Sequence, residues 1–152
     1  MTYQEIIDRL PYSQPFHFVD ELQHVDSDGV EGSYCFHPDL HFYQGHFKEN
    51  PVTPGVILTE CCAQIGLVCL GIHLLGHEGL DDGLKSLQVA FSSSEMEFLL
   101  PVFPGETVRV ISKKEYFRFN KLKCSVQMFN AKEELVCKGI LAGMFKMVEH
   151  GS

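Results

Sequence analysis

The segment 54–76 constrains the fold of this chain more than any other part of its sequence. It is mostly apolar, and its apolar residues surround a predicted helix axis instead of forming a stripe. Thr53 is expected to cap this helix, with Pro54 in the first helical position. A helix that is apolar on all sides must be enclosed by its surroundings. Because Glu60 and Gln64 interrupt the apolar run and polar groups are costly in a bilayer, we expect enclosure by protein and no membrane span.

The remaining stretches alternate between apolar and polar residues, which predicts strands. They cover roughly 16–26, 30–36, 85–97, 106–118 and 122–147, the last broken by a turn near Asn130. A short helix is expected over residues 2–10, with Thr2 as its cap and Glu5 as the capping-box partner. One long helix with too many strands for a single open layer suggests a curved antiparallel sheet wrapped around it. The prediction is therefore an α+β fold, in a single domain that spans 1–152.

Charge and cysteine usage narrow the function classes. The 152 residues carry 12 Lys and Arg against 20 Asp and Glu, a net charge of -8, which disfavours nucleic-acid binding. The six cysteines lie in apolar or strand-like runs and form no C-x-x-C pair. The segment 1–5 lacks the basic start of a signal peptide. We therefore expect reduced thiols in a cytoplasmic protein.

Candidate functional groups gather where the long connection 37–53 meets the apolar helix. His46 lies in that connection, and Glu60 falls in the second turn of the helix. A buried carboxyl group must be paired, solvated by a cavity or protonated. Gln64 follows one turn later on the same face and can orient Glu60, while Gly55 offers a backbone N–H at the helix start. A base, an acid and an N–H donor suit proton removal next to a carbonyl group.

These residues closely resemble the β-hydroxyacyl-acyl-carrier-protein dehydratases of bacterial fatty-acid synthesis. That family carries G-H-F-P-x-x-P-x-x-P-G followed by an acid and a Gln. The matching residues here are Gly45-His46-Phe47, Pro51, Pro54-Gly55, Glu60 and Ala63-Gln64. The spacing from His46 to Glu60 matches without a gap, and weaker similarities at 10–20 and 101–106 extend the resemblance from about residue 10 to the last strand.

The resemblance implies a hotdog fold and a homodimer or a trimer of dimers. The active site would lie between two chains, without a metal or organic cofactor. His46 of one chain would remove the α-proton of a 3-hydroxyacyl chain held on the phosphopantetheine arm of acyl carrier protein. Glu60 of the other chain would protonate or orient the departing hydroxyl group, directly or through water. The product would be a trans-2-enoyl thioester. Gly55 would polarise the thioester carbonyl, and Gln64 would hold Glu60.

Three departures from the family pattern concern chain length and carrier recognition more than the reaction. Lys48 stands where the family has Pro, Tyr12-Ser13 replaces a frequent His-Arg pair, and Cys61-Cys62 replaces Ala-Met. A Glu at position 60, where Asp is the alternative, resembles the branch that does not also isomerise the double bond.

Two other functions stay open at this point. A hotdog thioesterase could use Glu60 alone to activate water, and a non-catalytic acyl-binding protein or heterodimer subunit could keep the same fold. The one concentration of positive charge lies on a predicted hairpin and consists of Lys113, Lys114, Arg118, Lys121 and Lys123. It is either a solvated sheet edge or a docking surface for an acidic carrier protein.

Overall fold

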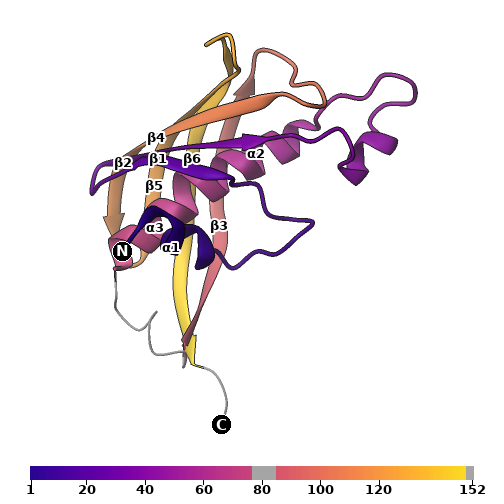
Figure 1. Ribbon diagram of the computed structural model, residues 1–152. Helices are drawn as coiled ribbons and strands as arrows, with labels where there is room; N and C mark the ends of the chain where they lie inside the picture. Colours follow the sequence, from indigo (N-terminus) through magenta and orange to yellow (C-terminus); the bar gives the residue numbers. More distant parts are fainter. Residues whose placement is uncertain (77–84, 150–152) are drawn as a thin grey trace.

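An antiparallel sheet of six strands wraps around one long helix (Figure 1). The structure is a computed structural model that describes residues 1–76 and 85–149. The strands are β1 (Glu21–Val25), β2 (Gly29–Cys35), β3 (Lys85–Phe98), β4 (Thr107–Arg118), β5 (Lys121–Phe129) and β6 (Leu135–Glu149). Their order in the sheet is β1-β2-β4-β5-β6-β3, and every neighbouring pair is antiparallel. This arrangement confirms the predicted hotdog architecture.

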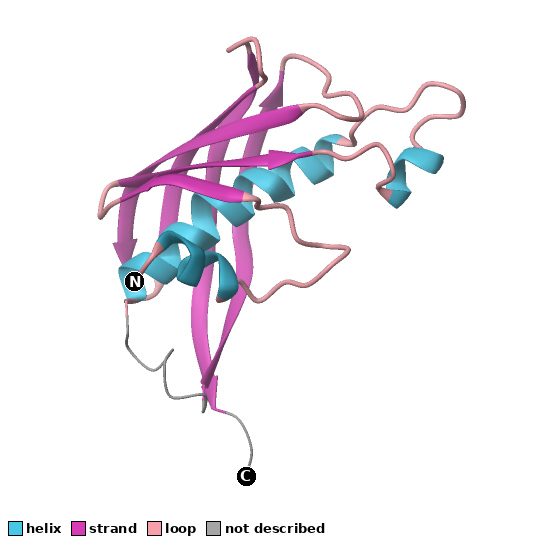
Figure 2. Cartoon of the chain, viewed as in Figure 1, coloured by secondary structure: helices cyan, strands magenta, loops and turns pink. Residues whose placement is uncertain are grey.

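The central helix is continuous from Gly55 to Leu75 (Figure 2). It consists of α2 (Gly55–Ala63), a π-helical part η2 (Gln64–Cys69) and α3 (Leu70–Leu75). By length and composition it could cross a bilayer, but 72% of its most apolar window is buried inside the protein, as predicted for a core helix. The remaining helices are α1 (Tyr3–Asp8) and a 3-10 turn, η1 (His41–Gln44).

The expected cap of the central helix was wrong. Pro54 is the N-cap residue and Gly55 is the first helical residue. The Thr53 side chain does not cap the helix, because its hydroxyl group is hydrogen-bonded to the Tyr43 hydroxyl in the preceding loop. Thr53 thus connects the loop to the start of the helix through a side-chain contact.

Two glycines allow the helix to lie close to the sheet. A Cβ atom on Gly66 would approach Val126 to 2.9 Å, and one on Gly71 would lie 2.2 Å from the Phe145 ring. The Ser112 hydroxyl donates a hydrogen bond to the Gly66 carbonyl over 2.8 Å, which attaches η2 directly to β4. Any side chain at these positions would force the helix or its neighbours to move.

The first strand is shorter than predicted. β1 begins at Glu21, and a bulge lies between Leu22 and His24. The backbone before β1 forms hydrogen bonds with the Gln64 side chain. The Phe18 N–H donates to the Gln64 amide oxygen, and the Phe16 carbonyl accepts from the Gln64 amide nitrogen. Hydrogen bonds to a helix side chain replace a sheet ladder in this segment.

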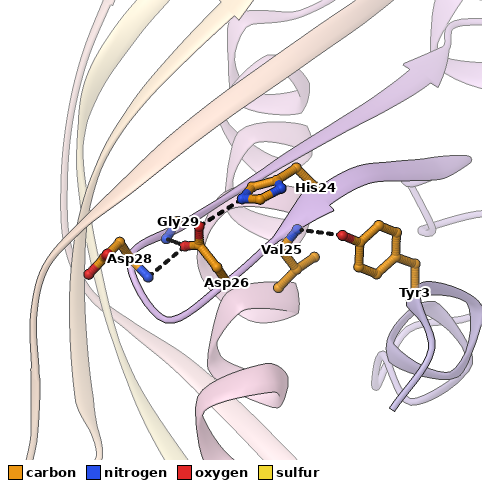
Figure 3. A network of polar contacts seen from close by, with 6 residues as sticks. All are labelled: Tyr3, His24, Val25, Asp26, Asp28 and Gly29. Atoms are coloured by element: carbon orange, nitrogen blue, oxygen red, sulfur yellow. Dashed lines mark hydrogen bonds and ion pairs between the residues drawn. The ribbon is translucent and has the colours of Figure 1, made fainter.

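A polar network shapes the turn between β1 and β2 (Figure 3). One oxygen of Asp26 accepts hydrogen bonds from the backbone N–H groups of Asp28 and Gly29, over 2.8 and 3.0 Å. The other oxygen lies 2.7 Å from the His24 ring. These bonds lower the pKa of Asp26, with the His24 contact as the largest cause. The turn after β1 is thus held by its own aspartate.

Helix α1 is capped as predicted and packs on β1. The Thr2 hydroxyl accepts a hydrogen bond from the Glu5 N–H over 3.1 Å. The Tyr3 hydroxyl accepts from the Val25 N–H over 3.3 Å and links the helix to the strand (Figure 3).

Candidate active site

Glu60 lies in the second turn of α2, half-buried between the helix and β3. It lines two cavities at once. The larger, of about 610 Å³, includes Gly55 and Phe98, and the smaller, of about 190 Å³, is bounded by Tyr12 and Phe91. Burial raises the pKa of Glu60, since the carboxylate has lost much of its water. The side chain therefore keeps its proton to a higher pH than an exposed Glu would, so that it can serve as a general acid.

Gln64 holds this carboxyl group in place, as the spacing predicted. Its amide nitrogen lies 3.3 Å from a Glu60 oxygen and donates to it, which partly offsets the rise in the pKa of Glu60. The Gln64 side chain is fully buried, and its oxygen accepts the Phe18 N–H over 2.7 Å. Both ends of the amide are thus paired, which leaves it no freedom to turn away from Glu60.

The N-terminal end of α2, where the sequence predicts an N–H donor, lies at the same cavity as Glu60. As the first helical residue, Gly55 has a backbone N–H without an acceptor inside the helix. It lines the same 610 Å³ cavity as Glu60. A Cβ atom at this position would lie 3.2 Å from the Phe98 ring, so the close approach of that ring favours glycine. The partial positive charge of the helix terminus points to the same space.

His46 lies in the loop that follows η1, beyond the N-terminal end of the central helix (Figure 2). Its Nδ1 is 2.9 Å from the Val52 carbonyl oxygen. A carbonyl can only accept, so Nδ1 carries the proton and Nε2 of the neutral ring has a free lone pair. The Phe47 ring stacks on the imidazole with 4.1 Å between centroids. These contacts fix the ring and its tautomer.

A single chain does not bring the predicted base to the predicted acid. Among the described residues, no hydrogen bond connects His46 with Glu60, and none of the described cavities around Glu60 includes His46. Gly55, Glu60 and Gln64 are brought together on one helix.

The predicted basic cluster lies elsewhere. Lys113, Lys114 and Arg118 belong to β4 and Lys121 begins β5. Their hairpin ends beside α3: the Phe145 N–H donates to Asn120 in the turn, and the Phe145 ring packs on Gly71. Gly71 lies about 24 Å along the helix from its start, at 1.5 Å per residue. The cluster and the His46 loop therefore occupy opposite ends of the molecule (Figure 1).

The residues that depart from the family motif differ in their exposure to solvent. Lys48 is exposed in the loop next to His46. Cys61 and Cys62 are fully buried, and burial raises the pKa of both thiols, so they serve as small core residues and not as nucleophiles. Tyr12 is half-buried and reaches the cavity beside Glu60.

Sequence reasoning did not identify the aromatic residues of the site. Phe91 and Phe98 line the cavities around Glu60 and remain 46% and 48% exposed, although both are large and apolar. They lie on β3, one of the two edge strands of the sheet. The alternation of β3 predicts a strand, but which of its residues face the helix depends on a bulge between Phe91 and Ser93. No group of three or more metal-ligating side chains occurs within residues 1–76 and 85–149.

Known proteins resemble this chain over most of its length. The family model of the FabA-like domain matches residues 10–139. A 3-hydroxyacyl-[acyl-carrier-protein] dehydratase FabZ from Ehrlichia canis is 31% identical, with 96% of both chains covered. The FabZ protein of Clostridioides difficile is 30% identical over 98% of this chain and 99% of its own.

Solved structures show the same fold at lower identity. The dehydratase heterocomplex ApeI:P from Xenorhabdus doucetiae aligns with a TM-score of 0.76 and 12% identity, over 96% of this chain and 91% of that one. A thioesterase from Haemophilus influenzae aligns with a TM-score of 0.69 and 18% identity, over 100% and 96% of the two chains. Both similarities concern the hotdog fold alone. Together with the domain match and the full-length relatives, they place this chain in the FabA-like, FabZ-type family of hotdog 3-hydroxyacyl-[acyl-carrier-protein] dehydratases.

Proposed function

We propose that this protein is a cytoplasmic hydro-lyase that removes water from a 3-hydroxyacyl-acyl-carrier-protein thioester and leaves the trans-2-enoyl thioester. The reaction would serve fatty-acid synthesis or a related polyketide or polyene pathway. One observation carries the proposal: a half-buried Glu60 with a raised pKa, held by Gln64 and facing the same cavity as the Gly55 N–H. This arrangement suits an acid that protonates a leaving hydroxyl group beside a polarised carbonyl.

Each step follows from a group in the site. The Gly55 N–H donates to the thioester carbonyl oxygen and makes the α-hydrogen more acidic. Nε2 of His46 takes the α-proton, and the electron pair of that C–H bond forms the new double bond. The C–O bond at the β-carbon breaks, and the oxygen leaves as water with the proton of Glu60. His46 ends protonated and Glu60 ionised, and a proton returned between them through solvent restores both.

We propose that the complete site forms between two copies of the chain. β3 is an edge strand with an unpaired side, and exposed edges with apolar side chains favour pairing with another chain. Phe91 and Phe98 are exposed beside Glu60, where a second chain would cover them. A homodimer could bring His46 of one protomer to Glu60 of its partner, and a trimer of dimers would repeat the same contact.

A mixing experiment tests the reaction and the shared site together. His46→Ala and Glu60→Gln are purified separately, unfolded, mixed and refolded, and conversion of 3-hydroxyacyl carrier thioester is followed by mass. Each variant alone should be inactive. In a mixed dimer one site has both wild-type residues, so random pairing restores roughly a quarter of wild-type activity. No recovery in refolded mixed dimers would contradict the shared site.

The same assay decides between this function and the alternatives. Loss of one water from the acyl chain supports the dehydratase. Release of free carrier thiol would instead indicate a thioesterase that uses Glu60 to activate water. Binding without either product over several chain lengths would indicate an acyl-binding subunit.

A further inference from the structure

Two cavities follow one another between the central helix and β3, and a third adjoins them between β3, β6 and the segment at Tyr12. The first, of about 610 Å³, lies over the start of α2. The second, of about 190 Å³, shares Glu60 and Phe91 with the first. The third, of about 520 Å³, shares Tyr12 and Val89 with the second. Because shared side chains form the walls between neighbouring cavities, Tyr12 and Val89 separate the space beside Glu60 from the third cavity.

The second cavity is a suitable place for an apolar chain. Apart from Glu60 and Tyr12, it is lined only by apolar side chains, including Leu67 and Val68 of η2. Its volume of about 190 Å³ is below the range of roughly 300–1,000 Å³ that holds a drug-sized ligand. The third cavity has more than twice the volume of the second, and Tyr12 and Val89 lie between the two.

Tyr12 closes this wall with an aromatic ring, while Val89 contributes only a short aliphatic side chain. The ring is half-buried, and its centroid lies 6.2 Å from that of Phe16. Burial and the nearby charge of Glu60 raise the pKa of Tyr12 to about 12, so its phenol stays neutral in the physiological range. A neutral aromatic ring can contact an apolar chain without a charge to desolvate.

We propose that the Tyr12 ring ends the acyl pocket of this protein and limits its substrates to short 3-hydroxyacyl chains. The inference rests on the proposed function, because it takes the occupant of the cavity beside Glu60 to be the acyl chain. Removal of the ring would join the second and third cavities into one long pocket. Tyr12 is then the residue that determines chain-length specificity, and not a catalytic residue.

Four proteins test the proposal: wild type, Tyr12→Phe, Tyr12→Ala and the double variant Tyr12→Ala/Met144→Trp. Each is assayed for kcat/KM on 3-hydroxyacyl thioesters of increasing length. We expect wild type and Tyr12→Phe to lose activity at the same length. Tyr12→Ala should gain at least about tenfold on longer chains, since single methylene groups in apolar pockets change kcat/KM by 10–200-fold. Met144 lines only the third cavity of the three and is 42% exposed, so a Trp there should reverse the gain without affecting short chains.

A binding measurement separates this inference from the proposed reaction. Saturated acyl-pantetheine thioesters lack the hydroxyl group to be eliminated, so calorimetry reports their affinity independently of turnover. If long chains bind more weakly to wild type than to Tyr12→Ala, the result supports Tyr12 as the end of the acyl pocket. This holds even if none of the four proteins dehydrates its substrate. Equal length profiles for wild type and Tyr12→Ala would overturn it, whether or not dehydration occurs. A shift in Tyr12→Phe equal to that in Tyr12→Ala would also overturn it, because the ring is still present. If Tyr12→Ala does not fold, Tyr12→Leu keeps an apolar contact with Phe16 and opens the wall in part.

Discussion

The side-chain amide of Gln64 donates to the Glu60 carboxyl group over 3.3 Å and accepts the Phe18 N–H over 2.7 Å. The same fully buried side chain therefore connects the proposed acid to the backbone that precedes β1. Gln64 is a positioning residue in this arrangement, because it acts on the reaction through Glu60.

Replacement of Gln64 by Leu should affect both stability and the pH profile. The Phe18 N–H would lose its partner in a buried place, which lowers the free energy of unfolding by about 1–3 kcal/mol in urea denaturation. Loss of the hydrogen bond should also raise the pKa of Glu60 further, since that bond lowers it. The pH at which activity declines on the alkaline side should move upward. A loss of stability with an unchanged pH profile would show that Gln64 does not act through Glu60.

Glu60→Gln should remove a pH-dependent cost of folding. The pKa of Glu60 is raised in the folded state, so the folded protein holds this proton more tightly than the unfolded chain. Stability is therefore greatest below the unfolded pKa and declines as the pH rises through the folded pKa. The unfolding free energy of wild type minus that of Glu60→Gln should fall over this interval. Thermal or urea unfolding of both proteins across that range checks the sign, and a difference that rises with pH would contradict it.

His46→Ala should reduce kcat by about 10²–10⁴-fold, the usual contribution of a positioned general base. Stability should fall by only about 1 kcal/mol, because the imidazole makes one neutral hydrogen bond, to the Val52 carbonyl. Steady-state kinetics and urea denaturation of the same preparation provide both values. A similar kcat in the variant would exclude His46 as the base.

A pair of variants at position 55 isolates the backbone donor. Ala and Pro both place a Cβ atom close to the Phe98 ring, but only Pro removes the N–H. Pro is tolerated in the first helical position, and the extended conformation of Pro54 is compatible with a following proline. Gly55→Pro should therefore lose about 10²–10³-fold more in kcat than Gly55→Ala, the cost of one oxyanion donor. Equal losses would mean that the N–H has no part in the reaction.

Charge reversal locates the carrier-protein surface. If the cluster on β4 and β5 binds the acidic carrier, Lys114→Glu/Arg118→Glu should raise KM for carrier-linked substrate and leave a small pantetheine thioester unaffected. Lys48→Glu, in the His46 loop at the other end of the molecule, is the matched control. If only Lys48→Glu raises KM, the carrier protein binds at the His46 loop and not at the cluster. If neither variant changes KM, neither surface binds the carrier.

The long helix and most strands could be predicted because their signals are local. An apolar run with Glu60 and Gln64 one turn apart has few alternatives in a chain of this size, and Pro-Gly marks its start. The short β1 could not be predicted, since the backbone at Phe18 bonds to a side chain distant in sequence. The prediction that Thr53 caps the helix was wrong for the same reason, because the Thr53 hydroxyl is hydrogen-bonded to the Tyr43 hydroxyl.

The motif predicted that Gly55, Glu60 and Gln64 lie close together, but not which residues form the walls of the site. Phe91 and Tyr12 come from segments that pack against the helix only in the folded protein. Tyr12 was visible only as a departure from the family pattern, which does not indicate what the ring contacts.

The π-helical part of the central helix separates two halves that face different neighbours. On one side lies Glu60, and on the other lies Gly71 against Phe145. One residue added or lost between Gln64 and Leu70 would turn one half relative to the other by about 100°, at 3.6 residues per turn. The number of residues in this stretch is thus as important as their identity.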